Sequence, residues 1–190
     1  MNSLRQTLNT LDAFTQRVGH IVAWLLILLV LMQGLVVLLR YGFSWGSIAL
    51  QESVTYLHAI CFMLGAAFTL QVDRHVRVDV LYRSMSLKQQ ALVNAVGSVL
   101  FLMPVCLFML WTSYDYVVQA WAIKERSADS GGLAAVYLLK TLIPLLAMSL
   151  FAQALVELGR SILALTGRNI GAYHDWIDAT NHVFRHLPSL

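Results

Sequence analysis

The sequence has few charged residues. Only 12% of its 190 residues are Asp, Glu, Lys or Arg, whereas 58% are hydrophobic and the mean hydropathy is +0.68. A soluble domain carries roughly 25% charged residues, so this deficit argues against a soluble fold and indicates a membrane protein. The formal net charge is only +3, and no basic stripe with interleaved aromatic residues is present. We therefore expect no nucleic-acid partner.

Cysteine and the common site motifs are scarce as well. Cys61 and Cys106 both lie in apolar runs, where packing is a more natural role than a disulfide. The sequence contains no C-x-x-C, H-E-x-x-H, G-x-x-x-x-G-K or G-x-G-x-x-G. Those motifs mark many metal, protease and nucleotide sites. We therefore predict no catalytic residue, no metal, no cofactor and no enzymatic activity.

What the sequence does contain is four long apolar runs, at residues 21–39, 48–70, 91–111 and 133–158. Each reaches the roughly 20 residues that a helix needs to cross the bilayer. The first run is long enough for a full span and shows no cleavage site, so we interpret it as retained rather than as a cleaved signal. Pro104 and Pro144 lie mid-span, where membrane helices tolerate a kink. The prediction is an all-α membrane protein with one four-helix domain over residues 1–166 and a tail over residues 167–190.

Lysine and arginine predict the orientation, because cytoplasmic loops are enriched in both. Nine of them flank the spans on the side of the termini: Arg5, Arg17, Arg74, Arg77, Arg83, Lys88, Arg160, Arg168 and Arg185. Three lie on the other side, Arg40, Lys124 and Arg126, and Lys140 lies within the fourth run. This asymmetry predicts that both termini are cytoplasmic.

The segments that flank the spans also carry helix signals. Apolar residues keep helical spacing from Leu4 to Ile21, which predicts an amphipathic helix in the membrane interface. A similar stripe runs from Tyr173 to Leu187, where an interfacial helix and a loosely ordered terminus both stay open. Ser86 and Gln89 match a capping box, so we expect a helix to begin at Leu87 and to become the third span. That helix should continue through residues 112–121, which contain no helix breaker.

Two charged residues lie inside the runs, where ionisable groups are costly and need a partner. Glu52 is about four residues into the second run and Lys140 about seven into the fourth, roughly 6 Å and 10 Å deep at the helical rise. Asp115 ends the third span on the same side of the membrane. We predict that Lys140 pairs with Glu52 or Asp115 and so fixes how the helices dock. The alternative is that Lys140 extends to the membrane surface.

The second run also carries a polar stripe at helical spacing, formed by Gln51, Thr55, His58, Gly65 and Thr69. Gly65 favours close helix approach, and the polar side chains are expected to form hydrogen bonds across helices. His58 as a haem ligand would need a facing axial ligand at similar depth. The other runs offer no histidine there. The lack of a facing ligand argues against haem. A haem-binding or structural membrane anchor of an oxidoreductase is the alternative function, and an autonomous small exporter or channel is a third.

A dense charge cluster follows the second run, with Asp73, Arg74, His75, Arg77 and Asp79 interleaved with valines. A catalytic site, a metal site and a structured turn would all suit such a cluster. No nucleophile or metal-ligand set accompanies it. In an extended segment, His75, Arg77 and Asp79 would lie on one side and the valines on the other. In a helix, Asp73–Arg77 and His75–Asp79 would be i,i+4 pairs of suitable sign, the second when His75 is protonated. We predict an internally paired turn that joins the second and third spans.

These residues together resemble a known family. Residues 50–82, LQESVTYLHAICFMLGAAFTLQVDRHVRVDVLY, are similar to the small membrane subunit of tripartite ATP-independent periplasmic (TRAP) transporters. The similar features are RY at Arg40-Tyr41, Trp45, Glu52, LGAA at 64–67, H-x-R-x-D at 75–79, and YLLKTLIP at 137–144. The resemblance covers about residues 15–165. Many members have two acidic residues at the start of the second span, whereas here Gln51 precedes Glu52.

The resemblance implies a non-catalytic helper in the bacterial inner membrane. In that family a periplasmic solute-binding protein captures the solute, usually an organic acid, and a large membrane subunit carries the solute and sodium sites. The small subunit packs against the large subunit and anchors it among the membrane lipids. The resemblance therefore implies that this chain itself binds neither the solute nor sodium.

Overall fold

The structure is a computed structural model that describes residues 2–71 and 85–166. The described part of the chain is helical and contains no strand: α1 Asn2–Gly42, α2 Ile48–Gln71, α4 Leu87–Gly97, η1 Ser98–Leu102, α5 Met103–Ala122 and α6 Val136–Leu165. Four helical stretches in it are long and apolar enough to cross a membrane: Ala13–Gly42, Ile48–Leu70, Leu87–Ala122 and Val136–Leu165. The all-α fold with four spans is thereby confirmed.

The helices are longer than the apolar runs that predicted them. α1 has 41 residues, about 60 Å at the helical rise, so the amphipathic segment and the first span form one unbroken helix. The predicted helix start at Leu87 is confirmed, because the Ser86 amide donates to Gln89 Oε1 at 2.8 Å and completes the capping box. The predicted continuation through residues 112–121 is also confirmed, since α5 ends at Ala122.

The helix accommodates Pro104 through a π-helical turn. η1 occupies Ser98–Leu102, and the Met103 amide donates to the Ser98 carbonyl, five residues earlier. Proline lacks an amide proton and crowds the carbonyl four residues before it. A π turn directly ahead of Pro104 widens the helix at that point. The stretch α4–η1–α5 therefore remains one helical rod.

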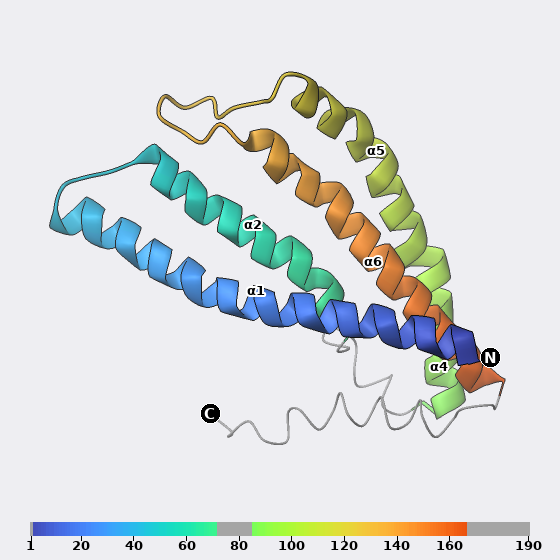
Figure 1. Ribbon diagram of the computed structural model, residues 1–190. Helices are drawn as coiled ribbons and strands as arrows, with labels where there is room; N and C mark the ends of the chain where they lie inside the picture. Colours follow the sequence, from blue (N-terminus) through green and yellow to red (C-terminus); the bar gives the residue numbers. More distant parts are fainter. Residues whose placement is uncertain (1, 72–84, 167–190) are drawn as a thin grey trace, which may run out of the picture.

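α6 is the central helix of the bundle. It packs against α1, α2, α4 and α5, while α1 lies beside α2 and α5 lies on the other side of α6 (Figure 1). The most apolar stretch of α6 is 39% buried, against 6% for that of α1. The core is therefore built around α6, and α1 forms an outer edge.

The two ends of the bundle differ in packing. Residues 43–47 and 123–135 connect the helices at one end, here called the loop end; α1 and α4 begin, and α2 and α6 finish, at the opposite terminal end (Figure 1). Most buried residues lie toward the terminal end, and residues 23–42 of α1 contain none. A Cβ atom at Gly19 of α1 would overlap the Phe68 ring of α2, so glycine permits this close contact. The helices thus pack most tightly at the terminal end.

Candidate functional site

The Glu52 carboxylate joins α2 to the loop between α5 and α6. It accepts hydrogen bonds from the Ser127 hydroxyl and from the Leu133 amide, the latter at 2.5 Å. The Ser127 amide donates to the Leu133 carbonyl at 3.0 Å, which closes the loop on itself. A Cβ atom at Gly132 would overlap both Ser127 and Glu52, so only glycine fits there. One carboxylate therefore holds both ends of the loop segment 127–133.

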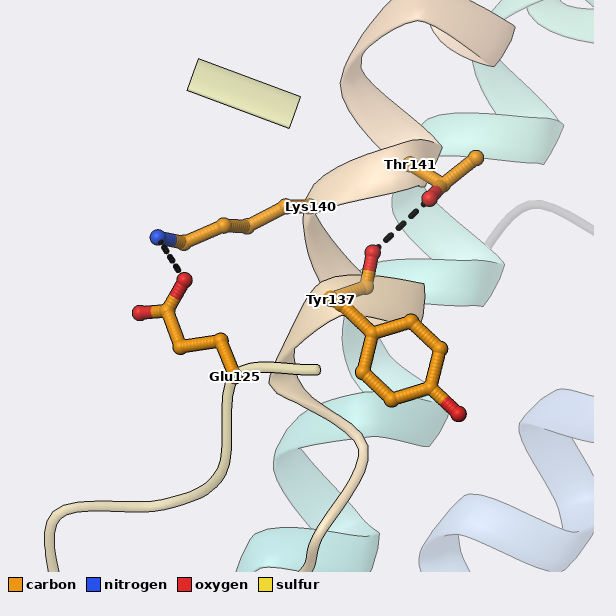
Figure 2. A network of polar contacts seen from close by, with 4 residues as sticks. All are labelled: Glu125, Tyr137, Lys140 and Thr141. Carbon is orange, nitrogen blue, oxygen red and sulfur yellow. Dashed lines mark hydrogen bonds and ion pairs between the residues drawn. The ribbon is translucent and has the colours of Figure 1, made fainter. Parts of the chain in front are cut away.

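Lys140 of α6 pairs with a different acidic residue than predicted. Its Nζ lies 2.5 Å from Glu125 Oε2 (Figure 2) and 3.8 Å from the centroid of the Tyr116 ring. The prediction that Lys140 pairs with Glu52 or Asp115 is therefore wrong. The chain turns back directly after α5 and brings Glu125 over the first turns of α6, while the oxygens of Glu52 bind the loop and Asp115 is exposed.

Sequence reasoning did not consider Glu125, although two signals pointed to it. It lies shortly after the end of a long helix, and only a short connection separates it from the span that carries Lys140. A carboxylate in such a connection can reach the first turns of the next helix. Lys140 thus has an anion on one side and an aromatic face on the other, which compensates for its position in an apolar span.

Aromatic contacts join α5 to α6 beside this ion pair. The Trp121 indole donates to Thr141 Oγ1 at 2.9 Å, and its ring meets Tyr137 edge-on at a centroid distance of 4.8 Å. Thr141 in turn donates to the Tyr137 carbonyl at 2.8 Å (Figure 2). The indole therefore ties the end of α5 to the start of α6.

A second polar region is buried near the terminal end. Six buried polar residues lie four apart along helices that pack together: Gln90, Asn94 and Ser98 from α4 and η1, and Gln153, Glu157 and Ser161 from α6. Thr15 of α1 donates to Gln153 Oε1 at 3.4 Å. Polar side chains between membrane helices give specific contacts where apolar packing alone gives little preference. This buried polar region therefore fixes how α1, α4 and α6 meet.

The polar stripe of α2 only partly behaves as predicted. Gly65 lies against Val22 of α1, and an added Cβ atom would be 3.4 Å from Val22 Cγ1. Thr55 and Thr69, however, donate to the carbonyls of Gln51 and Gly65 in their own helix, at 3.4 Å and 3.0 Å. The expected hydrogen bonds across helices are therefore wrong for these two threonines, because a carbonyl one turn earlier is nearer.

His58 lies in an open groove between α1 and α2. The groove is lined by Leu29, Val30 and Gln33 of α1 and by Val54, Thr55 and His58 of α2. The side chains of Gln33, Thr55 and His58 are exposed there. Thr55 and His58 of the polar stripe thus face the groove beside α1.

Several predicted residues lie outside the described part of the chain. They are the charge cluster Asp73, Arg74, His75, Arg77 and Asp79, and with them the tail over residues 167–190. Among the residues that the structure does describe, no three or more His, Cys, Asp or Glu side chains are grouped to hold a metal ion.

The chain matches a known protein family. A family model described as "Tripartite ATP-independent periplasmic transporters, DctQ component" matches residues 26–164. The matched region is well over half of the chain and takes in α2, α4, α5 and nearly all of α6, with the second half of α1. No curated protein and no solved structure matches the chain.

Proposed function

Since the chain belongs to the DctQ component family of tripartite ATP-independent periplasmic transporters, we propose that it packs against the large transport subunit and anchors it in the membrane. The family is one component of a tripartite system with a large permease and a periplasmic binding protein. The chain is a multi-pass protein of the bacterial inner membrane. Its solute in this proposal is an organic acid, carried by the large subunit.

The pairing of charges inside the bundle is the observation that supports a non-catalytic, scaffolding role. Glu52 binds the Ser127 hydroxyl and the Leu133 amide, and Lys140 binds Glu125. A solute or ion site within the membrane needs groups that are available to the cargo. Glu52 and Lys140 are instead used to hold α2 and α6 to the loop between α5 and α6.

The proposed orientation places the loop end in the periplasm and both termini in the cytoplasm. The excess of Lys and Arg on the side of the termini supports it. In this orientation the Glu52-bound loop faces the periplasmic binding protein.

Co-purification tests the assignment. When the chain is co-expressed with the large subunit of its transport system, the two should co-elute in mild detergent. Vesicles that hold both subunits should take up an organic acid when the binding protein is added, whereas vesicles that hold this chain alone should not. Separate elution in every mild detergent, or uptake by this chain alone, would contradict the proposal.

The charge cluster over residues 73–79 is proposed to be an internally paired turn at the cytoplasmic surface. The supporting pattern is the i,i+4 spacing of Asp73 with Arg77 and of His75 with Asp79. Arg77→Ala or Asp79→Ala should each lower the amount of assembled complex or its transport rate. Wild-type values of both quantities in both variants would contradict this role.

A further inference from the structure

We propose that the groove between α1 and α2 receives one transmembrane helix of the large subunit, recognised through the polar side chains of His58, Gln33 and Thr55. This inference rests on the proposed function and adds the contact surface and the chemistry of the contact. The partner helix must place a hydrogen-bonding side chain, such as an amide or a hydroxyl, at the depth of His58.

The first observation that supports this proposal is the depth of these side chains in the membrane. His58 lies ten residues from the start of α2, about 15 Å along the helix, and Gln33 lies nine residues from the end of α1, about 14 Å. α1 ends and α2 begins at the loop end of the bundle, so the two polar groups lie at one level. With about 30 Å of hydrocarbon to cross, that level is close to the bilayer midplane.

The second observation that supports the proposal is the exposure of these side chains. His58, Gln33 and Thr55 are exposed and line one groove. Among the described residues, neither His58 nor Gln33 forms a side-chain hydrogen bond, and Thr55 donates only to Gln51 of its own helix. Lipid tails offer no hydrogen bonds, so polar side chains at this depth normally face protein. A lipid-filled groove would leave the donors of His58 and Gln33 without a partner.

The third observation that supports the proposal is the shape of the groove. α1 and α2 approach closely at Gly19 with Phe68 and at Gly65 with Val22, whereas they separate enough for an open groove at Leu29–Gln33 and Val54–His58. The lining includes a valine from each helix, Val54 of α2 and Val30 of α1, the latter 69% exposed. A helix fits such a groove by placing small residues along the line of contact. The apolar residues of the groove then contact the apolar sides of that helix, while His58, Gln33 and Thr55 contact one hydrogen-bonding side chain on it.

Replacing the polar side chains of the groove by leucine distinguishes a protein partner from lipid. In His58→Leu/Gln33→Leu the polar groups are lost, so a lipid-facing groove would be at least as stable as before. If the groove binds the large subunit, the affinity for that subunit should fall about threefold to tenfold for each hydrogen bond removed. Affinity is measured in lipid nanodiscs with the full-length chain and the purified large subunit, and folding is checked by thermal unfolding. His58→Gln, which keeps a hydrogen-bonding group, should retain most of the affinity.

A matched control lies on α5. Thr112 is exposed, and its hydroxyl donates to the Phe108 carbonyl at 2.9 Å, much as Thr55 does within α2. Thr55→Val should weaken association, whereas Thr112→Val should leave it unchanged. Equal effects of the two variants, or wild-type affinity of the Leu double variant, would overturn the proposal.

Photo-crosslinking identifies the occupant directly. A benzoylphenylalanine at Val30 or Val54 should crosslink to the large subunit, and one at Leu107 on α5 should not. Crosslinks from the groove to a second copy of this chain or only to lipid would overturn the proposal. If wild-type subunits co-elute but crosslink through Leu107 alone, only the groove assignment fails. If they do not associate at all, the proposed function fails with it.

Discussion

At the scale of single residues, one carboxylate organises the loop end. Glu52 binds a hydroxyl and a backbone amide from the same loop, and hydrogen bonds to a charged acceptor are among the stronger ones. The sequence correctly marked Glu52 and Lys140 as residues that need partners, because charges in apolar runs are costly. It did not predict the donors to Glu52, because a hydroxyl and a backbone amide in a loop carry no charge pattern that sequence reasoning can match. For Lys140 it considered only acidic residues of the spans, and Glu125 lies in the loop.

Removing the Glu52 carboxylate should release the loop over residues 123–135. In Glu52→Ala both hydrogen bonds are lost, so trypsin should cleave faster after the exposed Lys124 and Arg126. Glu52→Gln keeps an acceptor oxygen and should show a smaller increase. Cleavage is followed by mass spectrometry of the fragments in detergent, with Asp115→Asn on the exposed face of α5 as control. Identical cleavage of Glu52→Ala and wild type would contradict this role.

The contact between Trp121 and Thr141 should contribute measurably to stability. The indole nitrogen is 2.9 Å from Thr141 Oγ1, and hydrogen bonds between membrane helices are worth about 0.6 kcal/mol on average. A double-mutant cycle with Trp121→Phe and Thr141→Val should give a coupling free energy of about that size. The measurement is reversible unfolding in detergent monitored by circular dichroism. Strict additivity of the two substitutions would show that the bond contributes nothing.

At the scale of helices, the positions of small residues determine how closely the helices pack. Span number, the start of α4 at Leu87 and the extension of α5 to Ala122 could all be predicted, because long apolar runs, capping residues and the absence of breakers act locally. The π turn over Ser98–Leu102 and the role of Gly19 could not. Each depends on the position of another group, the Pro104 ring or the Phe68 ring.

Gly19 and Gly34 provide a matched test of helix packing. Both lie in α1, but a Cβ atom at Gly19 would overlap Phe68, whereas one at Gly34 meets nothing within 4 Å. Gly19→Ala should lower the free energy of unfolding by about 1 to 3 kcal/mol through overpacking. Gly34→Ala should be neutral or slightly stabilising, because alanine favours the helix. Thermal unfolding in one detergent compares them, and Phe68→Ala should largely rescue Gly19→Ala. Equal stabilities of the two glycine variants would refute the close contact.

At the scale of the whole molecule, the orientation is the property that most affects the assembly. The count of Lys and Arg predicts that the loop end lies in the periplasm. The structure gives this end a well-formed surface, since Glu52 holds the loop over residues 123–135 in place. A periplasmic partner would therefore meet a defined loop.

Cysteine labelling in intact cells tests the orientation. Ser130→Cys should react with a maleimide that passes the outer membrane but not the inner one, because Ser130 is exposed in the loop. Lys88→Cys, exposed at the start of α4, should react only after the inner membrane is broken. The wild-type chain serves as the background control, since Cys61 and Cys106 are both buried. The reverse pattern of labelling would invert the proposed topology.

The uneven packing of α1 has a mechanical consequence. The helix is held near Gly19 and Val22, whereas residues 23–42 contribute no buried residue. From Gly19 to Gly42 the helix extends about 35 Å, so a rotation of about 10° at the held part would displace the far end by about 6 Å. In such a rotation α1 would act as a lever arm, with its pivot where the chain is most tightly packed. A small rearrangement at the terminal end would be delivered, amplified, to the opposite face of the membrane.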